Sequence, residues 1–588
     1  MDRSLELLHS FRILVPYLST KDATNLFSTS RILLQYKFAY LNSFYLDLDL
    51  NGGSTSTSTF TFPLGTNIKK LYLGLNCVID MASLPKSIAH ITFHPKSTIF
   101  PKVLIFHENI KNLVFGDYFN SPLILPSSLK KLVLGKNFII DKCEDLILPL
   151  GLTHLSINRL FRNSDETLIV PPTVTHLSLN GFNSEIFLVN QVALISYSYH
   201  GWLDDNIDFY PRNSQTLTHL DITLHQNMDF TSLLNLINLK IQTNHSYTNP
   251  HDLPSSIRHL TIKTNHRGSF VISSYPPNLS YLLYDSIVHG NRICSLDERL
   301  PSSLITLIAH GGRLERKIDF PPKLRHIDLF DYTHTLDNLP STLLSLKLRG
   351  VHHRKLDLSY LPNLTFVSAF KGYTHSSSPY EFVPPPSIST LKLGGFFTAS
   401  LDNPPLPSSL LHLKIGNGFN RSLRKLPQGL ETLKIGNSFN YDVEFLPKSL
   451  KSLIFTQYSI FSYPVDNLPP NLQVLVLGNR FNQEINNLPS GLKKLVLGYK
   501  FHHELHCLPR SLISLKLGSN LTSDRTHLSW IKNLIIPENI IAPFDNPYKV
   551  WLDWEYAAPL LVPIVVVTGI WVVADMFGIE GIFKAIKS

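Results

Sequence analysis

The sequence predicts an α/β repeat solenoid: one long parallel sheet of about 22 coils, with a small helical segment before it and a hydrophobic segment after it. Three observations lead to this prediction. The phrase Leu-Pro-x-x-Leu returns about every 20 residues, in the range typical of solenoid repeats. A short run of alternating apolar residues follows each clear copy. The chain of 588 residues is too long for one ordinary globular core.

Composition narrows the class of protein. Charged residues make up only 16% of the chain, so uncharged polar residues must cover much of the surface. The net charge of +9 is a mild bias over this length and does not indicate a nucleic-acid-binding protein. Four widely separated cysteines fit neither a disulfide framework nor a zinc site, and the N-terminus lacks the features of a signal peptide. We therefore expect a cytoplasmic protein with reduced thiols.

Residues 1–50 do not share the repeat, and we expect them to form two or three short helices. Apolar residues recur at helical spacing over residues 13–36, and Ser19 followed by Asp22 has the pattern of a capping box. The segment resembles an F-box, whose pattern is matched at Leu14, Tyr17, Leu18, Asp22, Leu26, Ser30 and Arg31, and the first five are the candidate partner-binding residues. The resemblance implies binding to the cullin-adaptor subunit of a ubiquitin ligase. The alternative is a helical cap that seals the solenoid, and the two roles are compatible.

A linker rich in Ser, Thr and Gly is expected over residues 51–67, and the coils over residues 68–525. In one clear copy, Leu433 and Ile435 alternate with Lys434, as on a half-buried strand whose apolar side chains face the core. No single copy can bury its own apolar side. Stacked copies can do so by forming a parallel sheet with strands about 4.8 Å apart.

The rest of this copy is expected to form the corners and interior of the coil. Gly436 allows a sharp bend, and Asn437 and Asn440 are turn-forming residues that can bond their own backbone. Phe439 is apolar, so we expect it to turn back into the core. Pro447 fixes the backbone where the next coil begins.

The first apolar position of the coil recurs along most of the chain, mostly at gaps of 19–25 residues, with a degenerate coil near Val192. It falls at Ile68, Ile88, Ile110, Leu129, Leu152, Val174, Leu217, Leu236, Ile257, Leu279, Leu304, Leu324, Leu343, Leu364, Ile388, Leu410, Leu430, Leu450, Leu472, Leu492 and Leu512.

These copies resemble FNIP repeats, a leucine-rich-repeat-like family named for its Phe-Asn-x-Ile core. Phe481-Asn482-Gln483-Glu484-Ile485 is close to that signature, and Phe419-Asn420 and Phe439-Asn440 also carry its first two residues. The resemblance covers residues 68–520 and is most specific over residues 406–518. It implies a leucine-rich-repeat-like solenoid with a long surface for binding proteins.

Side chains between the inward strand positions should project from the concave face. Several of them are lysines, which would form a ladder with one step per coil. The candidate partner-binding residues are Lys347, Lys392, Lys414, Thr432, Lys434, Lys494 and Lys516. The functional interpretation of such a ladder is a docking surface for an acidic protein partner. The alternative is that the lysines are solvated and keep the sheet from associating with its neighbours.

The composition changes abruptly near the C-terminus. Residues 526–556 are expected to be a cap or linker, and residues 557–574 contain no charge and just reach the length of a membrane span. An amphipathic tail of residues 575–588 follows. The segment 557–574 predicts a membrane anchor with the solenoid facing the cytosol, and the alternative is a cap over the last coil.

No catalytic motif, cofactor-binding motif or metal site is predicted. The stretch 502–507 is rich in histidine, but its residues occupy ordinary coil positions. The expected function is therefore that of a non-enzymatic protein-binding module, and the F-box resemblance implies a substrate receptor of an SCF-type ubiquitin ligase. The alternative is a membrane-anchored structural scaffold.

Overall fold

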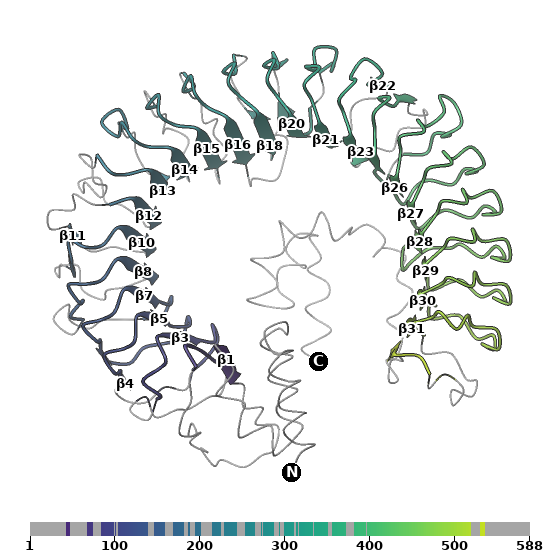
Figure 1. The fold of residues 1–588 in the computed structure, drawn as a ribbon. Coiled ribbons are helices and arrows are strands. Elements are labelled where there is room, and N and C mark those ends of the chain that lie inside the picture. The colour runs from purple at the N-terminus through teal and green to yellow at the C-terminus, as the bar shows by residue number, and fades with distance from the viewer. Residues whose placement is uncertain are drawn as a thin grey trace, which may run out of the picture. The chain divides into compact units, whose positions relative to one another are not determined.

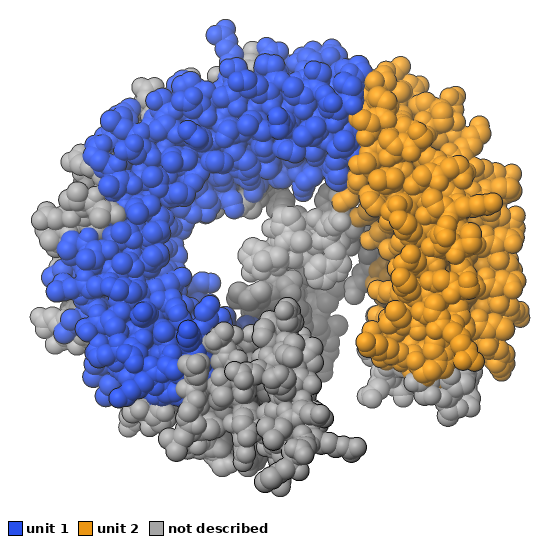
Figure 2. Space-filling view, viewed as in Figure 1, with its two compact units in different colours: residues 1–353, 360–369 blue, residues 354–359, 370–588 orange. Residues whose placement is uncertain are grey.

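A computed structural model describes residues 43–46 and most of residues 68–535. The second range is interrupted at residues 75–80, 82–83, 99, 101–103, 139–145, 159–167, 181–185, 189–193, 201–214, 225–228, 244–252, 265–271, 273, 287–292, 295–298, 311–312, 315–316, 333, 351–354, 372–380, 396, 519–527 and 529. The chain divides into two compact units (Figure 2). Unit 1 is residues 1–353 with 360–369, and unit 2 is residues 354–359 with 370–588.

Unit 1 is built on parallel strands, each paired in register with the strand of the next coil. Figure 1 shows them on the inner side of an arc. The strands are β1 (Ser43–Leu46), β2 (Lys70–Leu73), β3 (His90–Phe93), β5 (Asn112–Val114), β7 (Lys131–Leu134), β8 (His154–Asn158), β10 (His176–Asn180), β12 (Ser196–His200), β13 (His219–Leu224), β14 (Asn238–Thr243), β15 (His259–Thr264), β16 (Tyr281–Ser286), β18 (Thr306–His310), β20 (His326–Phe330) and β21 (Ser345–Arg349).

Unit 2 repeats the same arrangement with shorter strands. These are β25 (Thr390–Leu393), β26 (His412–Ile415), β27 (Thr432–Ile435), β28 (Ser452–Phe455), β29 (Val474–Val476), β30 (Lys494–Val496), β31 (Ser514–Lys516) and β32 (Asn533–Ile535), again paired in parallel and in chain order. One further strand, β23 (Phe366–Lys371), contains residues of both units.

Four small two-stranded sheets supplement the long strands. Figure 1 shows β4 and β11 on the outer side of unit 1. The pairs are β4 (Leu104–Ile105) with β6 (Leu123–Ile124), β9 (Leu168–Val170) with β11 (Ile186–Leu188), β17 (Ile293–Cys294) with β19 (Arg313–Leu314), and β22 (Lys355–Asp357) with β24 (Glu381–Val383).

The predicted parallel solenoid is confirmed. A strand follows every predicted coil start from Ile68 to Leu512, and β12 lies where the degenerate coil was expected. Within β27, Leu433 and Ile435 are buried, whereas Thr432 and Lys434 are half-buried on the other face. Alternation along the strand thus decides which side chains form the core and which remain available to a partner.

The predicted α/β class is wrong for the described residues, which form strands and turns with almost no helix. The Phe-Asn corner and the Pro-x-x-Leu turn return the chain without the helix that many parallel crossovers use. The predicted helical range 1–50 also contains a strand, since Ser43–Leu46 form β1 beside β2. At the other end, β32 extends the sheet past residue 525.

Several predictions fall outside the described residues. These are the F-box-like positions (Leu14, Tyr17, Leu18, Asp22 and Leu26), the linker at residues 51–67, and the segments 557–574 and 575–588. Among the residues that the structure does describe, no helix has the length and apolar character needed to cross a membrane.

The Leu-Pro-x-x-Leu phrase forms the turn that opens each coil. In one example, the Leu430 N–H donates to the Pro427 carbonyl at 3.1 Å, and the same bond recurs in most coils. Beside it, the Ser449 hydroxyl donates to the Leu430 carbonyl of the preceding coil at 2.6 Å. The recurring proline and serine therefore shape the turn and fasten it to its neighbour.

Gly436 is required by close approach rather than by a bend of the kind we expected. A Cβ atom at this position would lie 2.3 Å from the Gly416 carbonyl oxygen of the preceding coil. Gly416, Gly498 and Gly518 are in similarly tight contact with the backbone of the preceding coil. Successive coils pack backbone against backbone along this column, which leaves no room for a side chain.

The asparagines that recur in successive coils bond to the next coil rather than to their own backbone. The Asn440 N–H donates to Asn420 Oδ1 at 3.0 Å, and the Ser462 N–H donates to Asn440 Oδ1 at 3.1 Å. Asn417 Oδ1 accepts from the Asn437 N–H in the same way, at 3.3 Å. These side chains satisfy backbone donors that a corner would otherwise leave unpaired.

Candidate protein-binding face

The exposed side of the unit 2 strands contains most of the lysines singled out in the sequence. Lys392, Lys414 and Lys434 are the third residues of β25, β26 and β27, and the strand register places them side by side. All three are half-buried. Thr432 lies in the neighbouring column, in register with His412. The sequence therefore located three adjacent basic side chains correctly on one face.

The third residues of successive strands form one column on this face, and the first residues form another. Beyond the three lysines, the residues of the third column are apolar. Ile454, Val476 and Val496 continue it on β28, β29 and β30, and each is half-buried. Lys516 restores a basic residue on β31, whereas Lys494 lies in the first column of β30. No carboxylate occupies the first or third column of β25–β32. The face thus has a basic part and an apolar part.

Lys347 lies in unit 1 and has a different environment from the other predicted lysines. Its Nζ is 3.8 Å from Asp328 Oδ2 and 5.9 Å from the centroid of the Phe366 ring. Asp328 is only 6% exposed, and Arg349 donates to both of its oxygens, from Nε at 3.0 Å and from Nη2 at 2.9 Å. His310 Nε2 lies 3.0 Å from Oδ1. Lys347 therefore belongs to an ion-pair cluster.

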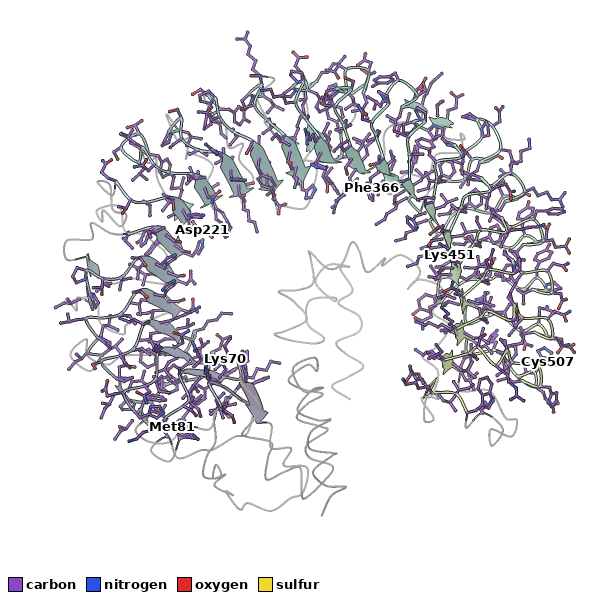
Figure 3. The ribbon with its side chains drawn as sticks, viewed as in Figure 1. Lys70, Met81, Asp221, Phe366, Lys451 and Cys507 are labelled. Atoms are coloured by element: carbon purple, nitrogen blue, oxygen red, sulfur yellow. The ribbon has the colours of Figure 1, made fainter. Side chains whose placement is uncertain are left out.

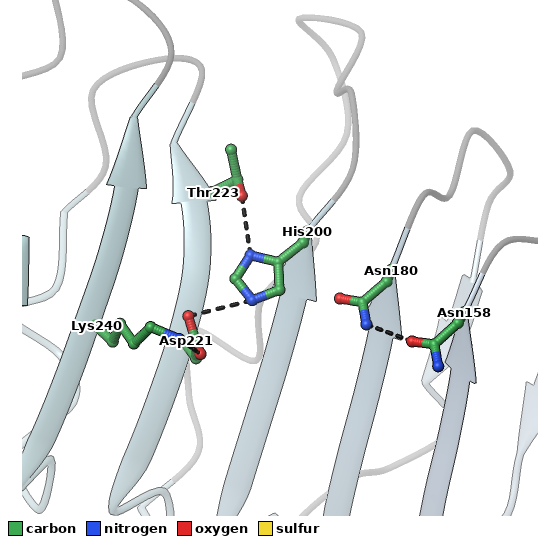
Figure 4. Close-up of polar contacts among 6 residues, drawn as sticks. All are labelled: Asn158, Asn180, His200, Asp221, Thr223 and Lys240. Atoms are coloured by element: carbon green, nitrogen blue, oxygen red, sulfur yellow. Dashed lines mark hydrogen bonds and ion pairs between the residues drawn. The ribbon is translucent and has the colours of Figure 1, made fainter. Parts of the chain in front are cut away.

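The same cluster occurs a second time in unit 1 (Figure 4). Asp221 is paired with Lys240 on the next strand and lies 3.2 Å from His200 Nε2 on the preceding strand. His200 Nδ1 is 2.9 Å from the Thr223 hydroxyl. In both clusters, aspartate and lysine are third residues of adjacent strands, and histidine is the fifth residue of the strand before the aspartate.

The carboxylates of both clusters are held in their charged form. Burial alone would raise the pKa of Asp221, but its contacts with His200 and Lys240 lower it below the usual range. Burial likewise acts to raise the pKa of Asp328, and its contacts with His310 and Arg349 outweigh that effect and lower it. Both aspartates are consequently anions in neutral solution.

The chain Thr223–His200–Asp221 has the connectivity of a nucleophile, a base and an orienting acid. Its surroundings argue against catalysis. Thr223 is only 6% exposed, so a substrate has no access to its hydroxyl. Lys240 also neutralises Asp221, which is then less able to stabilise a charged imidazole. The arrangement is better explained as a link between strands.

Sequence reasoning missed both clusters because it followed lysines alone along the third column. The signal was nevertheless readable: an aspartate at the third strand position is followed, one coil later, by a lysine at the same position. The histidine-rich stretch 502–507 forms no metal cluster, and within the described residues no group of three or more His, Cys, Asp or Glu is placed to hold a metal ion. Figure 3 shows Cys507 on the opposite side of unit 2 from Lys451.

The repeat itself matches a known family at four places. The FNIP repeat matches residues 100–137, 419–458, 463–500 and 484–520. The chain contains FNIP repeats. Three of the matches lie in unit 2, where the sequence reading was most specific, and one lies in unit 1. No curated protein sequence matches the chain.

Solved structures show the same type of fold. CroV588, described as a novel circular leucine-rich-repeat protein, is 21% identical, with a TM-score of 0.52 over 82% of this chain and 90% of that chain. YopM from Yersinia enterocolitica WA-314 is 19% identical (TM-score 0.35, 77% and 88% coverage), and the TLR13–ssRNA13 complex is 16% identical (TM-score 0.48, 81% and 74%). The likeness to CroV588 shows that the FNIP-repeat chain has the fold of a leucine-rich-repeat-like solenoid.

Proposed function

We propose that this FNIP-repeat protein is a non-enzymatic binding module whose unit 2 face takes a protein segment with acidic residues followed by apolar ones. One observation supports this choice above all: Lys392, Lys414 and Lys434 are adjacent in one column, and the apolar residues that begin with Ile454 continue it. A segment running across the strands would meet one of these side chains about every 4.8 Å. Its carboxylates would pair with the lysines, and its apolar side chains would cover the rest.

The lysine column has an energetic reason to attract a partner. Lys392, Lys414 and Lys434 place three positive charges side by side on one face. An acidic segment would be attracted to these charges during encounter. The apolar residues would contribute burial that does not depend on salt.

The test compares two charge reversals of equal size. The variant Lys392→Glu/Lys414→Glu/Lys434→Glu alters the face, and the control Lys425→Glu/Lys448→Glu/Lys500→Glu alters exposed lysines away from these columns. Proteins captured from a cell lysate are compared by mass spectrometry. We expect the face variant to lose a set of proteins that the control retains. Equal capture by both variants, or equal loss, would refute the proposed face.

A finer proposal concerns the N-terminal segment and relies on sequence alone. We propose that Leu14, Leu18, Asp22 and Leu26 bind the cullin-adaptor subunit, so that the protein is a substrate receptor of an SCF-type ubiquitin ligase. Residues 1–60 should then capture the adaptor, and Leu18→Asp should abolish capture. Failure of the wild-type segment to capture it would remove the ubiquitin role and leave the unit 2 face untouched.

The alternative function is that of a scaffold attached to a membrane. The observation that favours it is the uncharged run of residues 557–574. A reporter carrying residues 545–588 should sediment with membranes if this proposal holds. A reporter that stays in the soluble fraction would exclude the anchor.

A further inference from the structure

A rim of accessible side chains follows unit 1 where the chain enters each long strand. From β2 to β21, the residue before each of these strands and the first strand residue together form this entry rim. The N–H groups of Lys130 and Lys131 both donate to the Lys111 carbonyl, at 2.7 and 2.9 Å, and a shared carbonyl of this kind recurs in each coil from β3 to β21. Each strand thus begins with a bulge, and no residue of the entry rim is buried.

The entry rim is strongly basic. None of its residues is aspartate or glutamate, and among the described residues no carboxylate pairs with its lysines and arginines. In unit 2, by contrast, Glu431 lies just before β27 and pairs with Lys451 at 2.6 Å. The net charge of +9 does not reveal the entry rim, because the carboxylates of the chain lie elsewhere. The basic residues are Lys69, Lys70, Lys111, Lys130, Lys131, Arg258 and Arg325, and the histidines are His90, His154, His176, His219, His259 and His326.

The charged and the planar side chains of the entry rim lie close together. Burial is the first cause that lowers the pKa of His90, and the charges of Lys70 and Lys111 lower it further. Two strands on, His259 lies against another ring, with its centroid 5.8 Å from that of Tyr281. A partner that approaches the entry rim therefore meets positive charges and flat rings in alternation.

Hydrogen bonds hold several of the rings in place. The Thr175 hydroxyl lies 2.9 Å from His176 Nδ1, and the Thr218 hydroxyl lies 2.8 Å from His219 Nδ1. His154 is held in the same way by the threonine before it, at 2.9 Å. Rings that are already oriented lose little conformational entropy when a partner stacks on them.

One face of the His176 ring is available for stacking. His154 covers the other face, with ring centroids 4.1 Å apart and planes inclined by 7°. On the available side the in-register residues are Ser196 and, one strand further, His219. Two strand spacings, about 9.6 Å, separate the two histidines, and the small serine between them does not fill that width. A nucleic-acid base, about 3.4 Å from the next base in a stack, fits there.

We propose that the entry rim of unit 1 binds single-stranded nucleic acid. The lysines and arginines pair with the phosphates, and a base stacks on His176 on the side of Ser196. Proteins that bind single strands combine a basic track with aromatic rings, and histidine is one of the residues on which bases stack. An acidic peptide uses the charges but not the rings, and a duplex keeps its bases stacked on one another. This function is additional to protein binding by the unit 2 face.

The experiment measures the binding of a fluorescein-labelled single-stranded oligonucleotide of mixed sequence to the full chain. Fluorescence anisotropy gives the affinity at several salt concentrations. The variant Lys70→Ala/Lys111→Ala/Lys131→Ala removes three phosphate contacts. We expect weaker binding and a slope of log affinity against log salt that is shallower by about 2.

A second variant separates stacking from charge. His176→Ala removes the stacking ring and should weaken binding about 5- to 100-fold while leaving the salt slope unchanged. His219→Ala alters the other side of the same space and should also weaken binding. The control Lys425→Ala/Lys448→Ala/Lys500→Ala removes three exposed lysines of unit 2 and should bind like wild type.

Four results would overturn the proposal. The first is that the wild-type chain does not bind the oligonucleotide at low salt. The second is that inorganic polyphosphate or polyglutamate displaces the oligonucleotide as well as unlabelled single strand does, which would make the entry rim a general anion surface. The third is that a duplex of the same sequence binds as tightly as the single strand. The fourth is that His176→Ala and His219→Ala both bind like wild type.

Discussion

Both units stack coils through parallel strands, but their coils differ in strand length and in the residue that follows the strand. In most coils of unit 2 a glycine follows the fourth residue counted from the strand start, as Gly416 follows Ile415 and Gly436 follows Ile435, whereas Thr456 follows β28. The strands of unit 2 have three or four residues. Over much of unit 1 a polar residue replaces that glycine, and the strands run to five or six residues. Where the glycine is present, the coils approach too closely for a side chain. The longer strands occur where a side chain occupies this position instead.

Loss of the glycine gives unit 1 an additional exposed column. The fifth strand residue faces the same side as the first and third, since side chains alternate along a strand. His200, His310 and Arg349 all occupy this fifth position, and each contacts an aspartate of the clusters. The irregular coils of unit 1 can therefore form ion-pair clusters on their exposed face that the regular coils of unit 2 have no position to form.

The interiors differ as well. Unit 2 contains a continuous spine of Phe397, Phe419, Phe439, Phe461, Phe481 and Phe501, with successive ring centroids 6.0–6.4 Å apart. In unit 1 a comparable stack joins Phe119 and Phe138 at 5.5 Å, inside or next to the matched repeat at residues 100–137. The regular coil thus combines a glycine corner with a phenylalanine interior.

The largest expected effect is from removing one ring of the spine. Phe439→Ala deletes a fully buried side chain that stacks on Phe419 and Phe461, and should cost about 3–5 kcal/mol of local stability. Hydrogen exchange should report the loss in β26, β27 and β28, because each coil contacts only its neighbours. The control Phe445→Ala removes a ring that is 52% exposed and should cost far less. Equal costs would mean that the spine does not stabilise unit 2.

A methyl group on the glycine column should have the next largest effect. Gly436→Ala places a Cβ atom against the backbone of the preceding coil, and overpacking of this kind should cost about 2–3 kcal/mol. The control Gly491→Ala adds the same methyl group where no atom lies within 4 Å. Urea unfolding should separate the two variants. If both behave like wild type, close approach is not the reason for the glycine.

The regular coil of unit 2 shows which features could be predicted from the sequence and which could not. The period of Leu433 and Ile435 predicted the strand and its buried face, because that information is local to each copy. The reason for Gly436 could not be predicted, because it depends on how closely one coil approaches another. The same holds for Asn440, whose partner lies in the next coil.

For the candidate site as well, the positions of the residues could be predicted from the sequence, but their contacts with other strands could not. Lys392, Lys414 and Lys434 could be located because each occupies the same place in a regular copy. The position of Lys347 was also right, but its partner Asp328 lies on another strand and was not recognised. The place of a side chain within its coil can be predicted from one repeat, whereas its contacts with neighbouring strands require the register of several strands.

The next prediction concerns the exposed face of unit 1 and its dependence on pH. The pKa of Asp328 is lower in the folded protein than its ordinary value of 3.8. Its stabilising contribution is therefore complete above that ordinary value and is lost as the pH falls through the lowered folded value. Asp328→Asn should cost about 1.5–3 kcal/mol at neutral pH, the range for hydrogen bonds to a charged group, and should flatten the acid dependence of unit 1 stability.

A matched control tests whether burial of Asp328 is the reason. Asp337 pairs with Lys317 at 2.9 Å, but both side chains are well exposed. Asp337→Asn should cost far less than Asp328→Asn, because water screens exposed pairs. Hydrogen exchange of β18, β20 and β21 at two pH values compares the variants. A cost at Asp337 as large as that at Asp328 would contradict the assigned role of burial.

The smallest expected effect concerns the asparagine bond between regular coils. Asn440→Ala removes the acceptor for the Ser462 N–H, and water can reach this exposed bond, so the cost should be about 0.5–1 kcal/mol. The control Asn486→Ala removes a side chain that bonds to Glu484 within its own coil. Because the Asn440 bond crosses between coils, its loss should speed exchange of the Ser462 amide specifically. If instead both variants leave that amide equally protected, the Phe-Asn corner stabilises unit 2 through its phenylalanine alone.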